Sequence, residues 1–299
     1  MIPISRPFAN ADGRFAFYYL IELAPRPEPY ILQALTKRKL GRRVSVIADN
    51  IASAESLWRS IRREADAVAA GDAALGRSIS LSILDHPGLG TAVAFQIGQR
   101  LGTDSETRAL FTRIAHEAFS ASPDLVEAAS CDLQVIVLHD PASKALLPAL
   151  LNKGYMALQA WRVANWLWRR DRTDLALLLQ SASSEQLQVS IHPSASIGTS
   201  VFLDHATGII LGASVSIADE VTIMQNVTVG RKQADGGRAP TIGRGVLLST
   251  GATIVGDLKI GDYAKVGAGS VVTQDVPAGC TAIGVPARLT NCPAESAPT

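Results

Sequence analysis

The sequence predicts an α+β protein in which an all-α N-terminal domain is followed by a parallel solenoid of six-residue repeats. One observation is a regular beat in the C-terminal third, where an apolar and usually β-branched residue recurs at every sixth position. Another is the helical spacing of apolar residues through the middle of the chain. With 299 residues, the chain is long enough for two domains that each bury a core.

Two series of apolar residues have this six-residue period, which is called the beat below. The first is Ile191, Ile197, Leu203, Ile209, Val215, Val221 and Val227, and the second is Ile242, Leu248, Ile254, Ile260, Val266 and Val272. A helix repeats about every 3.6 residues and a strand every 2, so neither produces this beat, whereas a solenoid does. Glycines between the apolar positions suit its tight corners, which explains them better than a phosphate-binding loop.

The chain divides into four expected segments. Residues 1–52 are expected to form an extension, because prolines there would break a helix, and residues 53–184 are expected to form the α-helical domain. The solenoid covers residues 185–290, and residues 291–299 are expected to be a disordered tail.

Helices are predicted where apolar residues recur at spacings of three and four. These stretches are 54–68, 80–84, 89–101, 107–121, 122–138 and 148–170. The last is rich in aromatic residues, which favours a core or an oligomer interface over a cofactor site. A serine-rich linker at 181–184 is expected to lead into the solenoid.

Composition excludes several classes of function. A net charge of +1 and a pI near 7.8 provide no basic field for nucleic acid, and no apolar run is long enough for a membrane span. The start lacks a secretory signal, so a cytoplasmic enzyme or binding protein is expected. The three cysteines are far apart and form no zinc pattern, which predicts free thiols in a reducing compartment and no metal site.

Histidine is the commonest acid-base residue near neutral pH, and the chain has five: His86, His116, His139, His192 and His205. His86 and His116 are expected to be structural, and His192 to shape the first corner of the solenoid. His205 differs, because the pentad Asp204-His205-Ala206-Thr207-Gly208 places an acid and a histidine among small and apolar residues. Such a pair is costly to desolvate unless a function uses it, so His205 is the candidate general base.

A polar, glycine-bearing insertion from Gly230 to Thr241 separates the two series and carries Arg238. A loop whose ends are fixed by a rigid coil is a good place for function, although a merely tolerated surface insertion is the alternative.

Several motifs together resemble the serine O-acetyltransferases, a family of hexapeptide-repeat acyltransferases. The resemblance spans roughly residues 53–290, and its motifs are the pentad, His139-Asp140-Pro141-Ala142, Cys131-Asp132-Leu133-Gln134, Lys153-Gly154 and Gly284-Val285-Pro286-Ala287-Arg288. It implies a left-handed β-helix, assembly into trimers or pairs of trimers, and acetyl transfer from acetyl-CoA to the hydroxyl of L-serine, the first step of cysteine synthesis from serine.

The resemblance also assigns roles to residues. It makes His205 the general base, Asp140 and Asp204 the acids facing the substrate ammonium, and Arg238 the cation facing its carboxylate. Acetyl-CoA is expected along the coils at Thr250, Gly251, Gly267 and Ala268, with Lys265 and Arg288 near its phosphates. For Lys265, an ordinary surface charge is the alternative.

Three positions depart from the family pattern. Ser190 stands where the family has the aspartate that orients the base, Ala239 where it has a histidine, and Ala213 where it has a glutamate. Serine can accept a hydrogen bond from imidazole but offers no charge to the imidazolium. Two alternatives therefore stay open: acetylation of another hydroxyl acceptor such as homoserine, and a non-catalytic regulatory or scaffold subunit. The family's docking into cysteine synthase uses a C-terminal isoleucine, so with Thr299 that complex is not predicted.

Overall fold

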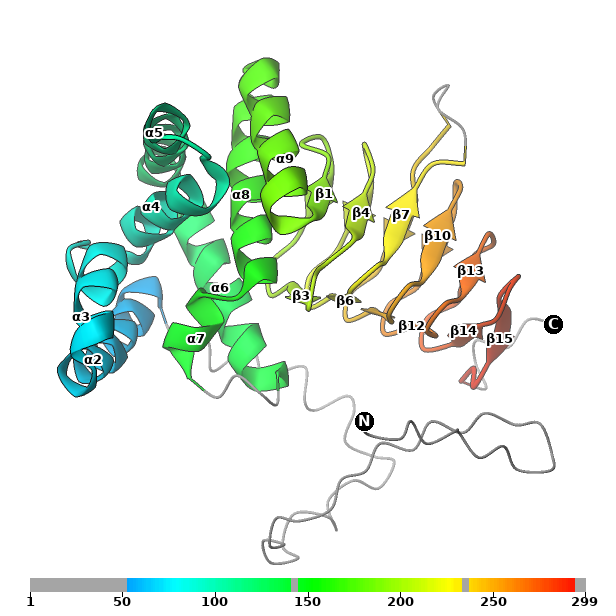
Figure 1. The fold of residues 1–299 in the computed structure, drawn as a ribbon. Helices are drawn as coiled ribbons and strands as arrows, with labels where there is room; N and C mark the ends of the chain where they lie inside the picture. Colours follow the sequence, from blue (N-terminus) through cyan, green and yellow to red (C-terminus); the bar gives the residue numbers. More distant parts are fainter. Residues whose placement is uncertain (1–52, 141–144, 233–236, 294–299) are drawn as a thin grey trace, which may run out of the picture. The chain divides into compact units, whose positions relative to one another are not determined.

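The computed structural model describes residues 53–140, 145–232 and 237–293. In this part of the chain, helices come first and strands follow without interleaving (Figure 1). The predicted α+β class, with a helical domain before a parallel β-solenoid, is confirmed. The predictions for residues 1–52 and for the end of the tail concern residues outside this description.

The described part of the helical domain has eight α-helices and one short π-helix. They are α2 (Ala54–Gly71), α3 (Ala73–Ile79), the π-helix η2 (Ser80–Leu84), α4 (Leu89–Leu101), α5 (Ser105–Ala121), α6 (Pro123–His139), α7 (Leu146–Leu150), α8 (Lys153–Trp168) and α9 (Thr173–Leu187). Apolar residues at helical spacing form the core, and Leu57, Ile61 and Ala65 of α2 are all buried.

The predicted stretches do not include α3 or α9, and the helices differ from the prediction in two further places. The stretch 148–170 is divided between α7 and α8, because the side chain of Asn152 caps a new helix by accepting hydrogen bonds from the N–H groups of Gly154 and Tyr155. Residues 181–184, predicted as a linker, lie within α9, which continues to Leu187. Ser183 is buried there, and its hydroxyl donates to the carbonyl of Val189, so this side chain bonds the helix to the first strand.

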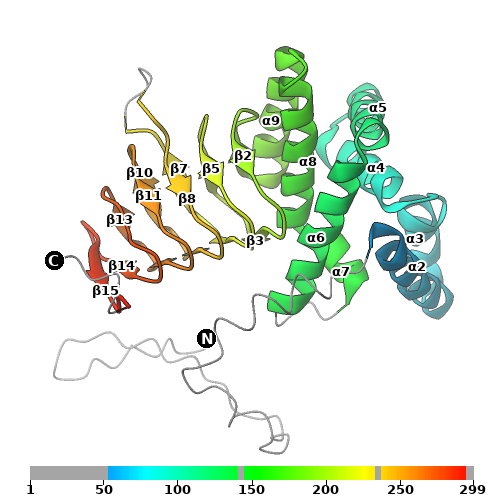
Figure 2. The ribbon, with the colours of Figure 1, turned by 180° about the vertical axis from the view of Figure 1, so that it is seen from behind.

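The strands form three sheets, which are the faces of the solenoid (Figures 1 and 2). Face A contains β1 (Val189–Ile191), β4 (Ile209–Leu211), β7 (Thr228–Gly230), β10 (Thr253–Val255) and β13 (Val271–Val272). Face B contains β2 (Ser196–Ile197), β5 (Ser216–Ile217), β8 (Thr241–Ile242) and β11 (Lys259–Ile260). Face C contains β3 (Phe202–Asp204), β6 (Thr222–Met224), β9 (Leu247–Leu248), β12 (Lys265–Val266), β14 (Thr281–Ile283) and the antiparallel β15 (Arg288–Thr290).

The six-residue beat produces the solenoid core. Every residue of the two series is buried, with at most 8% of its surface exposed. The residue two positions earlier is also buried in most repeats, as Val189, Ala195 and Val201 show in the first coil. Each repeat therefore has two inward positions, and the chain passes through faces A, B and C in turn.

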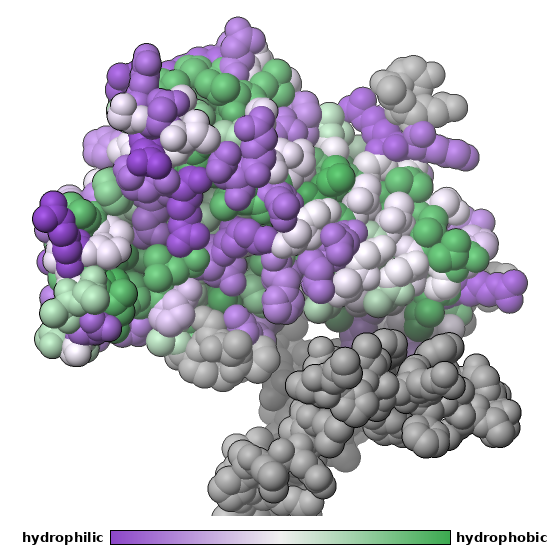
Figure 3. All heavy atoms as spheres, in the orientation of Figure 1, coloured by the Kyte–Doolittle hydropathy of each residue, from purple (hydrophilic) through white to green (hydrophobic). Residues whose placement is uncertain are grey.

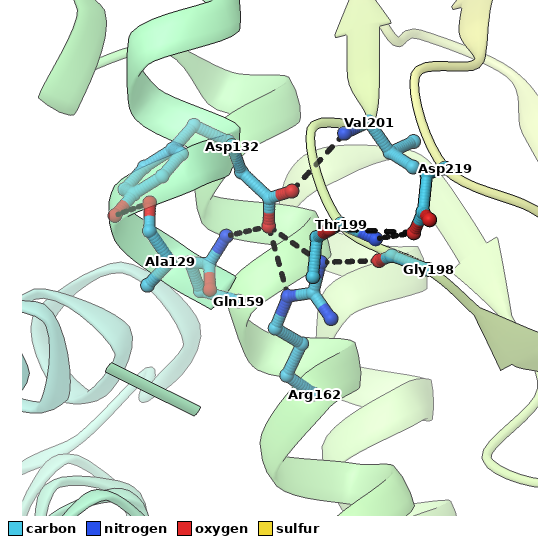
Figure 4. Close-up of polar contacts among 9 residues, drawn as sticks. Ala129, Asp132, Gln159, Arg162, Gly198, Thr199, Val201 and Asp219 are labelled. Atoms are coloured by element: carbon cyan, nitrogen blue, oxygen red, sulfur yellow. Dashed lines mark hydrogen bonds and ion pairs between the residues drawn. The ribbon is translucent and has the colours of Figure 1, made fainter. Parts of the chain in front are cut away.

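A buried ion pair joins the helical domain to the first coil (Figure 4). Asp132 of α6 and Arg162 of α8 lie 2.7 Å apart with their side chains 0% and 5% exposed. The second carboxylate oxygen of Asp132 accepts from the N–H of Val201, and Arg162 donates to the carbonyl of Gly198 at 2.7 Å. Burial raises the pKa of the Asp132 carboxyl, while the charge of Arg162 acts in the opposite direction.

Helix α8 makes further hydrogen bonds to the same coil. The indole N–H of Trp161 donates to the carbonyl of His192, and the side-chain amide of Asn165 donates to the carbonyls of Pro193 and Ala195. The ring of His192 packs edge-on against Trp168. The aromatic stretch predicted as core or interface thus lies between the helical domain and the solenoid.

The prediction of three free thiols is wrong, because Cys280 and Cys292 form a disulfide. Cys280 is fully buried and directly precedes β14, and Cys292 follows β15, so the bond closes the hairpin of these two strands. Residues twelve apart are joined because β15 reverses the chain direction, which the six-residue pattern does not reveal. Cys131 is a free thiol, and burial raises its pKa.

We predict that Asp132→Asn strongly destabilises the fold, because it leaves the guanidinium of Arg162 buried without its counter-charge. The expected loss is about 3 to 5 kcal/mol of the free energy of unfolding. Thermal and urea unfolding measure it. Glu117→Gln is the matched control, since it breaks the exposed pair with Arg172 and should cost at most about 1 kcal/mol. Equal losses for the two variants would contradict the assignment.

We also predict that reducing the disulfide loosens the β14–β15 hairpin. A cross-link over twelve residues contributes about 2 to 3 kcal/mol in the chain-entropy model. Tryptic cleavage after Arg288, followed by mass spectrometry, should therefore become at least about tenfold faster in a phosphine reductant. Cleavage after Arg77 in α3 is the internal control and should keep its rate. An unchanged rate at Arg288 would show that the hairpin holds without the bond.

Candidate functional site

The predicted pentad lies at the corner where the first coil passes from face C to face A. Asp204 is the last residue of β3, and Ile209, directly after Gly208, begins β4. Each later coil has its own corner between faces C and A, stacked next to the corner of the coil before it. The pentad is therefore one position in a column of corners.

The pentad corner is two residues longer than the corner of the next coil. Asp204 and Ile210 are six residues apart, whereas their partners Met224 and Thr228 are four residues apart. Within this longer corner, the side chain of His205 is exposed while Ala206 is buried. Each repeat has two inward positions that are two residues apart. The two additional residues shift the apolar series from one of these positions to the other, so the six-residue period in the sequence is not interrupted at the pentad.

The backbone of the pentad is held in an unusual conformation. His205 and Ala206 both have a φ of 55°, and Gly208 has a φ of 77°. Non-glycine residues in this left-handed region cost roughly 1 to 3 kcal/mol each, so the surroundings must hold them there. Ala206 is completely buried, and the N–H of Gly208 donates to the carbonyl of Gln188 at 2.8 Å. A Cβ at residue 208 would overlap the side chain of Asn226, so only glycine fits.

The imidazole of His205 is presented to solvent. Its side chain is 72% exposed, and Nε2 lies 3.7 Å from Oδ1 of Asp204, whose side chain is 25% exposed. This distance is an ion-pair contact rather than a good hydrogen bond. An exposed ring beside a carboxylate can accept a proton from a bound hydroxyl group.

The first turn of α8 contacts this corner from the helical domain. The ammonium of Lys153 donates to the hydroxyl of Thr207, inside the pentad. Gly154 packs so closely against the carbonyl of Leu203 that a Cβ would overlap it. The helical domain therefore supports the site directly.

The structure brings the predicted acetyl-CoA residues into the same column of corners. The N–H of Asn226 donates to the carbonyl of Thr207, that of Gly251 to Gln225, and that of Gly269 to Thr250. Coils are spaced like parallel strands, about 4.8 Å apart, so Thr250 lies roughly 10 Å from the pentad. The column contains Thr250, Gly251, Gly267 and Ala268. Lys265 on β12 and Arg288 on β15 are both exposed on face C.

Three candidate residues lie outside this column of corners. Asp140 is half-buried directly after α6, and its N–H donates to the carbonyl of Ile136. Ser190 is on face A, where its hydroxyl accepts from the side-chain amide of Gln180 at 3.2 Å. The insertion carrying Arg238 leaves the third coil between faces A and B, at the far end of face A from the pentad (Figure 1). Arg238 is exposed.

His192 lies at the corner where the first coil passes from face A to face B. Its Nδ1 lies 2.8 Å from the hydroxyl of Ser194, and burial, followed by the charge of Arg231, lowers its pKa. The hydroxyl of Ser194 accepts from the N–H of Ser214, whose own hydroxyl accepts from Arg231 at 2.9 Å. This network fixes the start of the insertion.

Sequence reasoning assigned no role to Asp132 or Lys153, although both lie in motifs that carried the family resemblance. Nothing in their local patterns shows that one joins the two domains and the other reaches Thr207. A charged residue inside an otherwise apolar helical face is the signal that could have drawn attention to Asp132.

Comparisons with known proteins agree with this architecture. The family model for the N-terminal part of serine acetyltransferase matches residues 57–160, and the bacterial transferase hexapeptide model matches residues 239–274. Serine acetyltransferase from Salmonella typhimurium is 40% identical over 247 residues, which are 82% of this chain and 90% of that protein. The chain belongs to the serine acetyltransferase family.

Other members of the family are similar over the same region. A probable serine acetyltransferase 1 of Oryza sativa is 43% identical over 78% of each chain. A soybean serine acetyltransferase solved with serine is 43% identical, covers 78% of this chain and 97% of its own, and has a TM-score of 0.76. A serine acetyltransferase solved with CoA is 37% identical, covers 79% and 100%, and also has a TM-score of 0.76.

Two further properties concern only the described residues. None of their helices combines the length and apolar character needed to cross a bilayer. They also contain no group of three or more histidine, cysteine, aspartate or glutamate residues placed to hold a metal ion.

Proposed function

We propose that this member of the family transfers the acetyl group of acetyl-CoA to the hydroxyl of L-serine, with His205 as the general base. The observation that carries the proposal is the pentad corner, which holds an exposed imidazole beside a carboxylate at the top of a continuous column of backbone corners. The solved relatives with serine and with CoA support the same two substrates.

The reaction follows from the chemistry of the two substrates. Neutral His205 takes the proton of the serine hydroxyl while the oxygen attacks the thioester carbonyl. The tetrahedral intermediate collapses with cleavage of the C–S bond, and the imidazolium returns the proton to the leaving thiolate. The products are O-acetylserine and CoA. Holding both substrates at one corner makes the attack effectively intramolecular.

The acceptor site needs carboxylates for the serine ammonium and a cation for its carboxylate. Asp204 meets the first need beside His205, and Asp140 is proposed as the second acid. Arg238 is proposed as the cation, since a guanidinium forms paired hydrogen bonds with a carboxylate. Ser190 is proposed to replace the family's orienting aspartate, although its hydroxyl contacts Gln180.

Acetyl-CoA is proposed to extend down the column of corners from the pentad. Its amide groups would pair with backbone groups around Thr250, Gly251, Gly267 and Ala268, so that the thioester reaches His205. Lys265 and Arg288 are proposed for the phosphates, because both are exposed cations on the coils nearer the end of the solenoid.

Assembly into a trimer, or a pair of trimers, is proposed to complete the site. Within one chain, the insertion with Arg238 and the pentad lie at opposite ends of the strands of face A. Another copy of the chain can therefore bring its Arg238 to this pentad. The outward residues of face A are uncharged, and Figure 3 shows white and green residues among the hydrophilic ones on the face turned to the viewer. The outward residues are Ser190, Ile210, Thr228, Thr253 and Val271. An uncharged face of this kind suits self-association.

We predict that the protein consumes acetyl-CoA in an L-serine-dependent reaction and that His205→Asn lowers kcat by about 10² to 10⁴. Loss of thioester absorbance measures the rate without a thiol reagent. L-Homoserine and a simple alcohol test the alternative acceptors. His116→Asn, an exposed histidine on α5, is the control and should keep the wild-type rate. If acetyl-CoA binds but no acceptor raises its consumption above background, the proposed function fails.

We also predict that Ser190→Asp raises serine-dependent kcat, by roughly tenfold, because a carboxylate can stabilise the imidazolium that serine cannot. Ser190→Asn is the matched variant, since it has a similar shape without the charge and should give no gain. Steady-state kinetics with both variants decide the matter. Equal or lower turnover for Ser190→Asp would mean that the site is organised differently, with Gln180 as the partner of residue 190.

A further inference from the structure

The pentad corner needs support beyond its own chain. Two adjacent non-glycine residues, His205 and Ala206, have positive φ values, and the corner is two residues longer than its neighbour. A longer corner has more conformations available when it is free, so holding one of them needs specific contacts. Burial of Ala206 is one such contact.

A second support comes from the helical domain through a hydrogen bond to Thr207, whose hydroxyl also lies near the His205 carbonyl. The ammonium of Lys153 donates to the hydroxyl of Thr207, and that hydroxyl lies 3.5 Å from the carbonyl oxygen of His205, to which it can donate. The N–H of Thr207 donates to the same carbonyl oxygen at 2.7 Å, so Thr207 is bonded to the peptide unit of His205. These contacts therefore connect Lys153 to the peptide unit of the candidate base.

The position of Lys153 is unfavourable for the helix itself. It is the first residue of α8, directly after the cap Asn152, and the first turn of this helix has no acidic residue. A cation at a helix N-terminus opposes the helix dipole, at a cost of typically 0.3 to 1 kcal/mol. The neighbouring Gly154 lies directly against the carbonyl of Leu203, where a larger residue would not fit, so the start of the helix is placed next to the corner. This placement indicates a use for the charge outside the helix.

We propose that Lys153 is a positioning residue for the reaction. Through Thr207 it holds the His205–Ala206 backbone in the conformation that directs the imidazole at the acceptor hydroxyl. The inference rests on the proposed function and extends it, because it gives the helical domain a part in the chemistry. Lys153 acts on the orientation of the base, so its loss should affect kcat more than the KM for acetyl-CoA.

The test combines Lys153→Met, Thr207→Val and the double variant in thioester-consumption kinetics. Each single change should lower kcat by roughly tenfold with less than a twofold change in the KM for acetyl-CoA. The double variant should be no slower than the slower single variant, because both remove the same connection. Lys153→Arg and Thr207→Ser, which keep the donor and the hydroxyl, should restore most of the rate.

Lys259→Met is the control, since this exposed lysine is on β11 of face B, away from the pentad. Multiplicative losses in the double variant would overturn the proposal. So would a kcat for Lys153→Met within twofold of the wild type, or a loss explained by a fall in thermal unfolding temperature alone.

A second readout does not require activity. Amide hydrogen exchange of peptides covering residues 203–208 should be roughly tenfold faster in Lys153→Met and in Thr207→Val, because the N–H groups of Ala206, Thr207 and Gly208 are hydrogen-bonded in the held corner. Unchanged exchange would overturn the positioning role. If wild-type protein has no activity with any acceptor, the proposed function fails, while the exchange result still decides whether Lys153 holds the corner.

Discussion

The contact on which the rest of the structure depends is the buried pair of Asp132 and Arg162. Each charge uses its remaining hydrogen-bonding capacity on the backbone of the first coil, at Val201 and Gly198. Such a pair is a poor source of stability compared with apolar packing, but it tolerates only one arrangement of the two domains. The same helix that supplies Arg162 then brings Lys153 and Gly154 to the pentad, which begins fifteen residues after the first residue of β1.

Repetition of the coils places the pentad corner at the end of a column of similar corners. Each coil repeats the corner between faces C and A, so one irregular corner above several regular ones gives a reactive group with a surface for a long co-substrate next to it. The cost of the irregular corner is met by burial of Ala206, by the hydrogen bond to Gln188 and by the helical domain. A rigid scaffold can hold such strain where a flexible loop could not.

The sequence predicts the solenoid well because thirteen beat residues are all inward, and it predicts the pentad because polar residues stand out on an apolar coil. It does not reveal the two additional residues at the pentad. The apolar series passes there from one inward position of the repeat to the other, so its six-residue spacing is unchanged. The serine-rich composition of residues 181–184 predicts a linker, because the pattern does not show that Ser183 can bond to Val189. Ser190, Asp140 and Arg238 depend on partners that spacing does not encode, and their roles stay predictions.

The reversal at β15 has a consequence for the ends of the molecule. A parallel solenoid exposes unpaired backbone groups at both ends, and such edges invite other chains to add strands. The helical domain covers the first coil, while β15 runs against the direction of face C and is fastened by Cys280 and Cys292. No further parallel coil can extend face C beyond that strand. The chain thereby protects itself from end-to-end polymerisation and sets the number of rungs on which a co-substrate can lie.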